Sequence, residues 1–221
     1  MPARSPILVN NEVYHVLNRA VGDENILVSK KDLERVLDLW DYYRFPQKLR
    51  FSKFRDLPSE IKENYLAEVK NQSPLVIIFS FSLMPNHYHL LLKQLQDGGI
   101  EKFISNFQNS FAKYFNLKNK RHGTLFQNSF KAKRVENEDQ FVHISRYIHL
   151  NPVTSFLIEF KDLAFYPWTS FSWYLNENKN RFVETDSLLK IFKTKENYKQ
   201  FVEDQTDYQR ELGLIKKLLD E

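Results

Sequence analysis

Two histidines separated by one residue are the first group in this sequence that could carry out chemistry. His87 and His89 lie in the run Leu83–Lys93, directly after the turn-prone pair Pro85-Asn86. The leucines and tyrosine of this run predict a strand, in which residues i and i+2 point to the same face. The two imidazoles would then lie side by side and could bind one divalent cation. The alternative is an ordinary pair of half-exposed strand histidines.

A tyrosine and an asparagine four residues apart form a second group. Tyr147 and Asn151 lie in a segment that Asn137 is predicted to cap as a helix and that Pro152 is predicted to end at about Asn151. Residues four apart share a helical face, so a phenol and a carboxamide oxygen would lie together, with His143 one turn earlier. The alternative for Tyr147 is a helix tyrosine that packs at the edge of the core.

Basic residues gather between these two groups. The interval from 113 to 134 contains no Asp or Glu, although the whole chain is nearly balanced with a net charge of +4. Such a local positive patch suits a phosphate backbone, and its alternative is a solubilising surface. Its members are Lys113, Lys118, Lys120, Arg121, Lys131, Lys133 and Arg134.

The order of these motifs resembles a known family. Residues 84–91 (MPNHYHLL) and 147–152 (YIHLNP) together resemble the single-tyrosine transposases of the histidine–hydrophobic–histidine (HUH) endonuclease superfamily, and in particular the REP-associated tyrosine transposases. The segment 123–135 also resembles the strand between the two motifs in that branch. The likeness extends over about 13–174.

This resemblance implies a metal-dependent enzyme that cleaves and rejoins single-stranded DNA near hairpins through a 5′-phosphotyrosine intermediate. Tyr147 would be the nucleophile, and His143 is a candidate activating base. His87, His89 and Asn151 would hold Mg²⁺ or Mn²⁺, with Asn151 standing where other relatives have Gln or Glu. Arg4 and Arg19 would contact bases near the foot of the hairpin.

The expected fold is α+β, with helices packed on an antiparallel sheet in the ferredoxin-like (RRM-like) arrangement. Strands are expected at about 12–21, 75–83, 86–93 and 125–135, and helices from Ser29, from Pro58 to about Val69, over 100–119 and over 137–151. We expect one transposase domain over 1–175, with a charged insertion at about 45–73, and a helical C-terminal extension over 176–221.

Composition excludes several other classes. The chain of 221 residues has no cysteine, which argues against a disulfide framework and a thiolate zinc site. It has only five glycines and no phosphate-binding loop. No apolar run is long enough to span a bilayer. We expect a cytoplasmic, nucleoid-associated protein that is a monomer or homodimer and has no membrane partner.

Three rival functions fit parts of this pattern. A catalytically degenerate regulator would bind hairpin DNA equally well with Tyr147 replaced by Phe. A replication-initiator or relaxase nickase is usually joined to helicase or partner domains, and the sequence has no nucleotide-binding loop. An RNA-binding ferredoxin-like module should carry aromatic side chains on the exposed faces of two central strands, and this pattern is not clear here.

Overall fold

The computed structural model describes residues 7–176 and 180–206, so Arg4 lies outside the described residues. By its contacts the chain divides into two compact units. The first contains the chain up to Ile77 together with Pro85–His87 and Leu92–Arg134. The second contains Ile78–Met84, Tyr88–Leu91 and the chain from Val135 onward. Two neighbouring strands of the sheet therefore contribute residues to both units.

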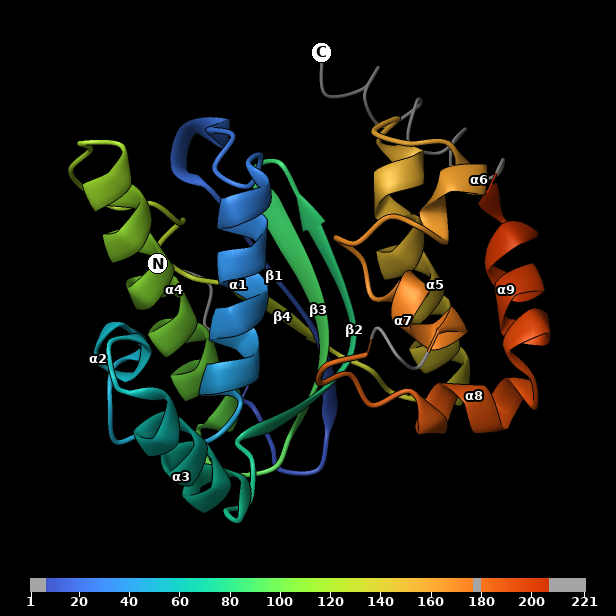
Figure 1. The fold of residues 1–221 in the computed structure, drawn as a ribbon. Coiled ribbons are helices and arrows are strands. Elements are labelled where there is room, and N and C mark those ends of the chain that lie inside the picture. The colour runs from blue at the N-terminus through green and yellow to red at the C-terminus, as the bar shows by residue number, and fades with distance from the viewer. Residues whose placement is uncertain (1–6, 177–179, 207–221) are drawn as a thin grey trace. The chain divides into compact units, whose positions relative to one another are not determined.

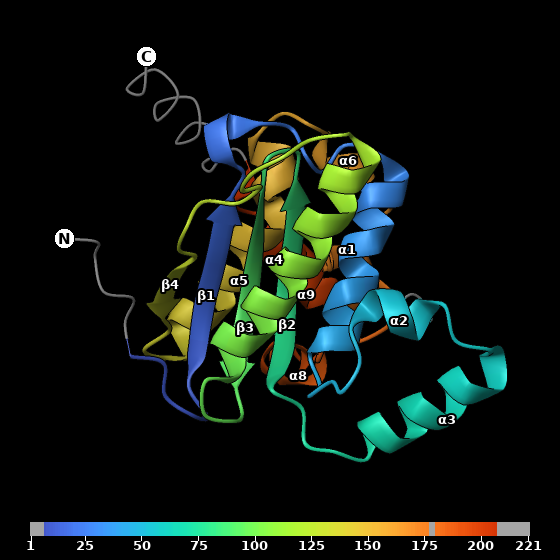
Figure 2. The same ribbon diagram turned by 90° about the vertical axis from the view of Figure 1, so that its left-hand side faces the viewer.

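The sheet has four strands: β1 (Val13–Arg19), β2 (Val76–Met84), β3 (His87–Gln94) and β4 (Lys131–Arg134). Their order is β2-β3-β1-β4 (Figure 2), the order of a ferredoxin-like β-α-β-β-α-β fold. β1 pairs with β4 antiparallel, with Tyr14 opposite Arg134 and Leu17 opposite Lys131. The predicted α+β class with an antiparallel sheet is confirmed.

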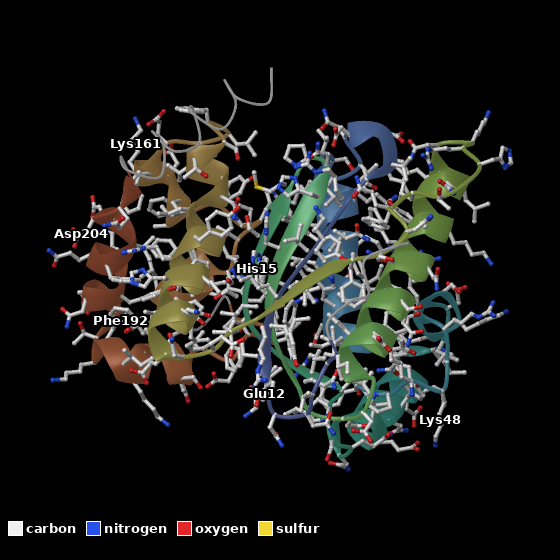
Figure 3. The ribbon with its side chains drawn as sticks, turned by 180° about the vertical axis from the view of Figure 1, so that it is seen from behind. Glu12, His15, Lys48, Lys161, Phe192 and Asp204 are labelled. Atoms are coloured by element: carbon white, nitrogen blue, oxygen red, sulfur yellow. The ribbon has the colours of Figure 1, made fainter. Side chains whose placement is uncertain are left out.

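The side chains of β1 alternate between two faces. Tyr14 and Val16 are fully buried, whereas His15 and Leu17 on the other face are only partly covered. Figure 3 shows Glu12 just before this strand and His15 along it. The strand therefore has one core face and one face with partial access to solvent.

The fourth strand is shorter than the predicted 125–135. The first part of the predicted strand instead forms a separate bridge, between Phe126 and Ala20. The side-chain amide of Asn18 then donates to the Gln127 carbonyl at 3.1 Å, so a side chain takes the place of a backbone donor there. Regular pairing resumes at Lys131.

The first unit contains the helices α1 (Lys30–Tyr43), α2 (Phe51–Arg55), α3 (Ser59–Lys70) and α4 (Gly99–Lys118), with a short 3-10 turn at Val21–Asp23. α1 and α4 lie side by side (Figures 1 and 2), with the rings of Trp40 and Phe107 in edge contact at 5.6 Å. The Ser29 hydroxyl caps α1 by accepting from the Asp32 amide at 3.2 Å. The helices predicted from Ser29, from Pro58 and over 100–119 are all confirmed.

The second unit contains α5 (Glu138–Thr154), α6 (Phe160–Leu163), α7 (Phe171–Leu175), α8 (Asp186–Phe192) and α9 (Lys195–Glu203). α9 packs against α5 and α7 (Figure 1), so part of the predicted C-terminal extension packs within this unit. The predicted domain boundary near 175 stays a prediction, and the last residues of the extension, 207–221, lie outside the described part.

α5 runs past its predicted end at Asn151 and includes Pro152. A proline disfavours the helical conformation of the preceding residue, but here burial outweighs that preference. Leu150 and Val153 are fully buried, so continuing the helix for one more turn keeps both in the core.

In the ranges 7–176 and 180–206, every helix is too short or too polar to cross a bilayer.

Candidate active site

The helix that carries Tyr147 begins at a well-formed cap. The Asn137 side chain accepts from the Gln140 amide at 2.9 Å, as the sequence predicts. The Gln140 side chain in turn accepts from the Glu136 amide at 3.0 Å. Caps of this kind stabilise a helix by about 1 kcal/mol, and this one fixes where α5 starts.

A chain of buried hydrogen bonds holds the middle of α5 in place. Ser145 bonds to Ser80 of β2 and to the Tyr198 hydroxyl of α9, both at 2.8 Å. Tyr198 also bonds to Nδ1 of His149 at 2.8 Å, and Nε2 of His149 bonds to Ser170 at 2.7 Å. Burial lowers the pKa of His149 to about 3, so this imidazole is neutral at physiological pH. His149 therefore orients the helix and does not face a substrate.

Tyr147 lies against His89. Their ring centroids are 5.7 Å apart and their planes are nearly perpendicular, at 89°. Tyr147 remains 40% exposed, whereas His89 is only 5% exposed. Burial raises the pKa of the Tyr147 phenol, and the neighbouring Asn151 side chain opposes part of that shift. A phenol in this setting is protonated at neutral pH and needs activation before it can attack.

Asn151 is tied to the turn that carries Tyr147. Its amide nitrogen donates to the Tyr147 backbone carbonyl at 3.0 Å, and the residue is 5% exposed. The carboxamide is therefore oriented by the helix itself. Its carbonyl oxygen, Oδ1, is the atom that could bind a metal ion.

The two histidines of β3 alternate with a buried residue, as predicted. Tyr88 is fully buried on one face, so His87 and His89 point to the other. His87 Nδ1 lies 2.6 Å from the Asn86 side-chain oxygen. Because that oxygen can only accept, Nδ1 carries a proton and donates to it. Metal-binding histidines are usually oriented by a bond of this kind from one ring nitrogen to an oxygen.

The candidate ligand set depends on a carboxamide. Within the part of the chain that the structure describes, no three or more His, Cys, Asp or Glu side chains are grouped so that they could hold a metal ion. Two imidazoles and one amide oxygen therefore remain the proposed set, and they fit Mg²⁺ or Mn²⁺ better than a metal that requires thiolates.

His143 is less well placed as a base than the sequence suggests. An Arg146 guanidinium nitrogen lies 2.6 Å from His143 Nδ1. Guanidinium groups only donate, so Nδ1 accepts and cannot take a proton from a phenol while this bond lasts. Both side chains also contact Phe201 of α9. His143 thus takes part in the packing of α5 against α9.

The predicted DNA-binding residues fall into two groups. Lys113, Lys120, Lys131 and Lys133 are exposed and form no ion pair within residues 7–176 and 180–206. The others have acidic partners: Arg19 with Asp23, Lys118 with Asp32, Arg121 with Glu24 and Arg134 with Glu12.

Sequence reasoning missed the residues that support this site. Asn86 directly precedes His87 in the motif, and that adjacency could have indicated its role in orienting the imidazole. Arg146 is buried beside Tyr147, and only its position next to the motif tyrosine hints at a function. Outside this site, His15 of β1 lies opposite Lys133 of β4, and burial and then the lysine charge lower the pKa of His15 to about 4.

Comparison with known proteins identifies the region that contains these motifs. Residues 45–151 match the family model described as IS200-like transposase. Over this range the chain is similar to the IS200-like transposases. The match includes His87, His89, Tyr147 and Asn151, and it also includes the 45–73 segment. The motifs that carry the proposed chemistry therefore lie inside the matched region.

A solved structure shares the fold of this chain. It is described as a REP-associated tyrosine transposase bound to a REP hairpin, and it is 14% identical, with a TM-score of 0.52 over 82% of this chain and 89% of that chain. A protein from Deinococcus radiodurans R1 described as a transposase is also 14% identical, over 66% of this chain and 94% of that one, with a TM-score of 0.37. No curated protein sequence matches the chain.

Proposed function

We propose that this chain is a metal-dependent single-stranded DNA endonuclease and transposase that cleaves and rejoins DNA near hairpins. The observation that carries the proposal is the contact between Tyr147 of α5 and His89 of β3, inside the region that matches the IS200-like transposase family model. This contact supports the proposal because it joins a candidate nucleophile and a candidate metal ligand from two motifs far apart in the sequence.

The Tyr147 oxygen attacks the scissile phosphorus. A phosphorus–oxygen bond to the tyrosine forms, the bond to the 3′ oxygen breaks, and the phenolic proton ends on the released 3′-hydroxyl or on solvent. The product is a 5′-phosphotyrosine and a free 3′-hydroxyl. Because the intermediate is still a phosphodiester, a 3′-hydroxyl can attack it, release the tyrosine and join a new strand end.

The proposed ligands are of types that a divalent cation can bind. His87 is oriented by Asn86, His89 lies next to Tyr147, and Asn151 offers a carboxamide oxygen one turn from the nucleophile. When bound there, Mg²⁺ or Mn²⁺ would polarise the scissile phosphate as a Lewis acid.

The protein itself must position the phenol and lower the cost of losing its proton. The buried bonds of Ser145 and His149 fix α5, and hence the direction of the Tyr147 side chain. His143 could serve as the activating base only through Nε2 or after releasing Arg146.

The proposed substrate is hairpin-bearing single-stranded DNA. The exposed cations Lys113, Lys120, Lys131 and Lys133 support this proposal, because they suit phosphate contacts that do not depend on base identity. Arg19, Lys118, Arg121 and Arg134 would add to these contacts where DNA competes with their acidic partners.

Two structural observations favour a second candidate, a regulator that binds hairpins without cutting them. Burial raises the pKa of Tyr147, and the imidazole one turn away already accepts a hydrogen bond from Arg146. Incubation with hairpin-bearing single-stranded DNA and Mn²⁺ separates the two functions. The transposase proposal requires a covalent protein–DNA adduct that resists denaturation, and tight binding with no adduct would favour the regulator.

A further inference from the structure

A basic hollow lies between α1, α2 and α4, within the first unit and outside the proposed active-site residues. Its volume is about 450 Å³. Four of its lining side chains are cations, Arg35, Arg50, Arg55 and Lys113, and no acidic residue lines it among those that the structure describes. Three of these cations were not among the DNA-binding residues that the sequence indicated, and two of them belong to the 45–73 segment.

Arg35 lines this hollow, and two aromatic rings hold its side chain. Its guanidinium lies over the ring of Tyr114 at 4.7 Å and over that of Phe51 at 5.1 Å. Burial and then the nearby charge of Arg55 lower its pKa, whereas Tyr114 and Asp38 act in the opposite direction. A group that is held by two rings and repelled by a like charge is well placed to receive an anion.

The other cations remain available to a ligand. Arg50 and Lys113 form no ion pair in the described part of the chain, and Arg55 pairs only with exposed Asp56, at 3.3 Å. Exposed pairs of that kind are worth little and are readily exchanged. Hydrogen-bonding side chains complete the lining: Ser52, Asn106, Asn109 and Ser110.

A second hollow of about 530 Å³ adjoins the first. The two share Lys113 and Leu117, and the second is lined further by Asn116 and the loop residues Lys120, Arg121, His122 and Gly123. Leu117, between them, is 73% exposed. No acidic side chain is among the described residues that line either hollow.

The two hollows follow one face of α4. Asn106, Asn109, Ser110, Lys113 and Leu117 recur at spacings of three and four residues. At 1.5 Å per residue, the stretch from Asn106 to Leu117 is about 17 Å long. Successive nucleotides of a duplex strand rise about 3.4 Å, so this face matches several consecutive phosphates better than one free anion.

We propose that these two hollows form a DNA phosphate-binding groove, built jointly by α1, α4, the 119–123 loop and the 45–73 segment. The segment would supply Arg50 and Arg55 to this groove, and that is the function we assign to it. The inference rests on the proposed function for its ligand, DNA, but concerns residues separate from Tyr147 and its metal ligands.

The test measures equilibrium binding of the full chain to fluorescent hairpin-bearing DNA without divalent metal, so that cleavage does not intervene. The double variant Arg50→Ala/Arg55→Ala should bind about tenfold more weakly, and the slope of log affinity against log salt should fall by about two, one for each phosphate that the variant no longer neutralises. The matched control Lys53→Ala/Lys70→Ala removes the same charge from exposed positions on α2 and α3 outside both hollows and should bind within about twofold of the parent.

Equal affinity and equal salt slope for the two double variants would overturn the groove. So would a result in which the arginine variant loses affinity for pyrophosphate but keeps its affinity for DNA, since the hollow would then serve a free anion. Lys113→Gln, on α4, provides an independent variant that should weaken DNA binding in the same direction. If binding depends on these residues while no Mn²⁺-dependent adduct ever forms, the groove stands and the proposed cleavage fails.

Discussion

The rings of His89 and Tyr147 meet edge to face, with 5.7 Å between centroids. The two residues come from different motifs, one on β3 and one on α5, and no local sequence pattern requires them to meet. Their contact places a candidate metal ligand beside a candidate nucleophile, and the proposed chemistry depends on that arrangement.

Replacing Tyr147 by Phe should abolish the covalent adduct with hairpin DNA while changing its dissociation constant by less than about twofold, because the phenolic oxygen is needed for chemistry and phosphate contacts supply the affinity. Gel analysis under denaturing conditions and anisotropy report the two quantities. Tyr166→Phe, on a partly exposed tyrosine of the same unit, should retain the adduct. An adduct that persists in the Tyr147 variant would assign the nucleophile elsewhere.

Replacing Asn86 by Ala should raise the Mn²⁺ concentration needed for half-maximal adduct formation by about 10–100-fold, because residues that orient metal-binding histidines typically matter to that degree. The structural reason is the 2.6 Å bond from His87 Nδ1 to the Asn86 oxygen. Asn128→Ala, at an exposed loop position, is the control. An unchanged metal requirement would remove Asn86, and with it the inferred orientation of His87, from the mechanism.

Acid should destabilise the protein between about pH 6.5 and pH 3 through His149. The folded pKa of His149 is lowered to about 3 from 6.5, so in this window the unfolded chain binds a proton that the folded chain does not. The free energy of unfolding therefore falls as pH decreases, by up to about 1.4 kcal/mol per pH unit, and the contribution is fully present above pH 6.5. His15, with a pKa of about 4, acts in the same direction.

Urea unfolding at several pH values measures this dependence. The His149→Gln variant should have a lower free energy of unfolding than the parent at neutral pH. As the pH decreases below neutral, its free energy of unfolding should fall less steeply than that of the parent. His122→Gln, on an exposed loop, should leave the slope unchanged. Parallel curves for the parent and the His149 variant would show that the acid sensitivity arises at other groups.

Replacing Asp32 by Ala should lower the free energy of unfolding by about 2–4 kcal/mol, since it leaves buried or partly buried donors without their acceptor. Its carboxylate accepts from Lys118 at 2.7 Å and from Tyr114 at 2.9 Å. Asp56→Ala removes only an exposed pair and should cost less than about 1 kcal/mol. Equal losses for the two variants would mean that the Asp32 bonds contribute little to stability.

Local signals in the sequence were enough to predict most elements. The Asn137–Gln140 cap and the alternation in β1 depend on neighbours within a few residues, and both are present. The predicted length of β4 was wrong. At Gln127 the chain bonds to the side chain of Asn18, a residue more than a hundred positions away, instead of continuing the strand. A pattern read along the chain contains no information about such a partner.

In the candidate site, too, local features could be predicted from the sequence and long-range contacts could not. Spacing alone placed His87 and His89 on one face of a strand, and Tyr147 and Asn151 on adjacent turns of a helix. It could not reveal that His149, within the same motif, is buried against Ser170 and Tyr198, or that Arg146 bonds to His143. These contacts involve long-range packing or side-chain direction, which spacing does not determine.

The bond from the Asn151 amide to the Tyr147 carbonyl ties the two candidate site residues directly to each other. Each residue of an α-helix advances about 100° around the axis, so inserting one alanine between them would rotate Asn151 away from the candidate nucleophile while leaving the helix itself able to form. The proposed chemistry thus depends on the register of one helical turn, and an insertion or deletion there would be more damaging than most substitutions.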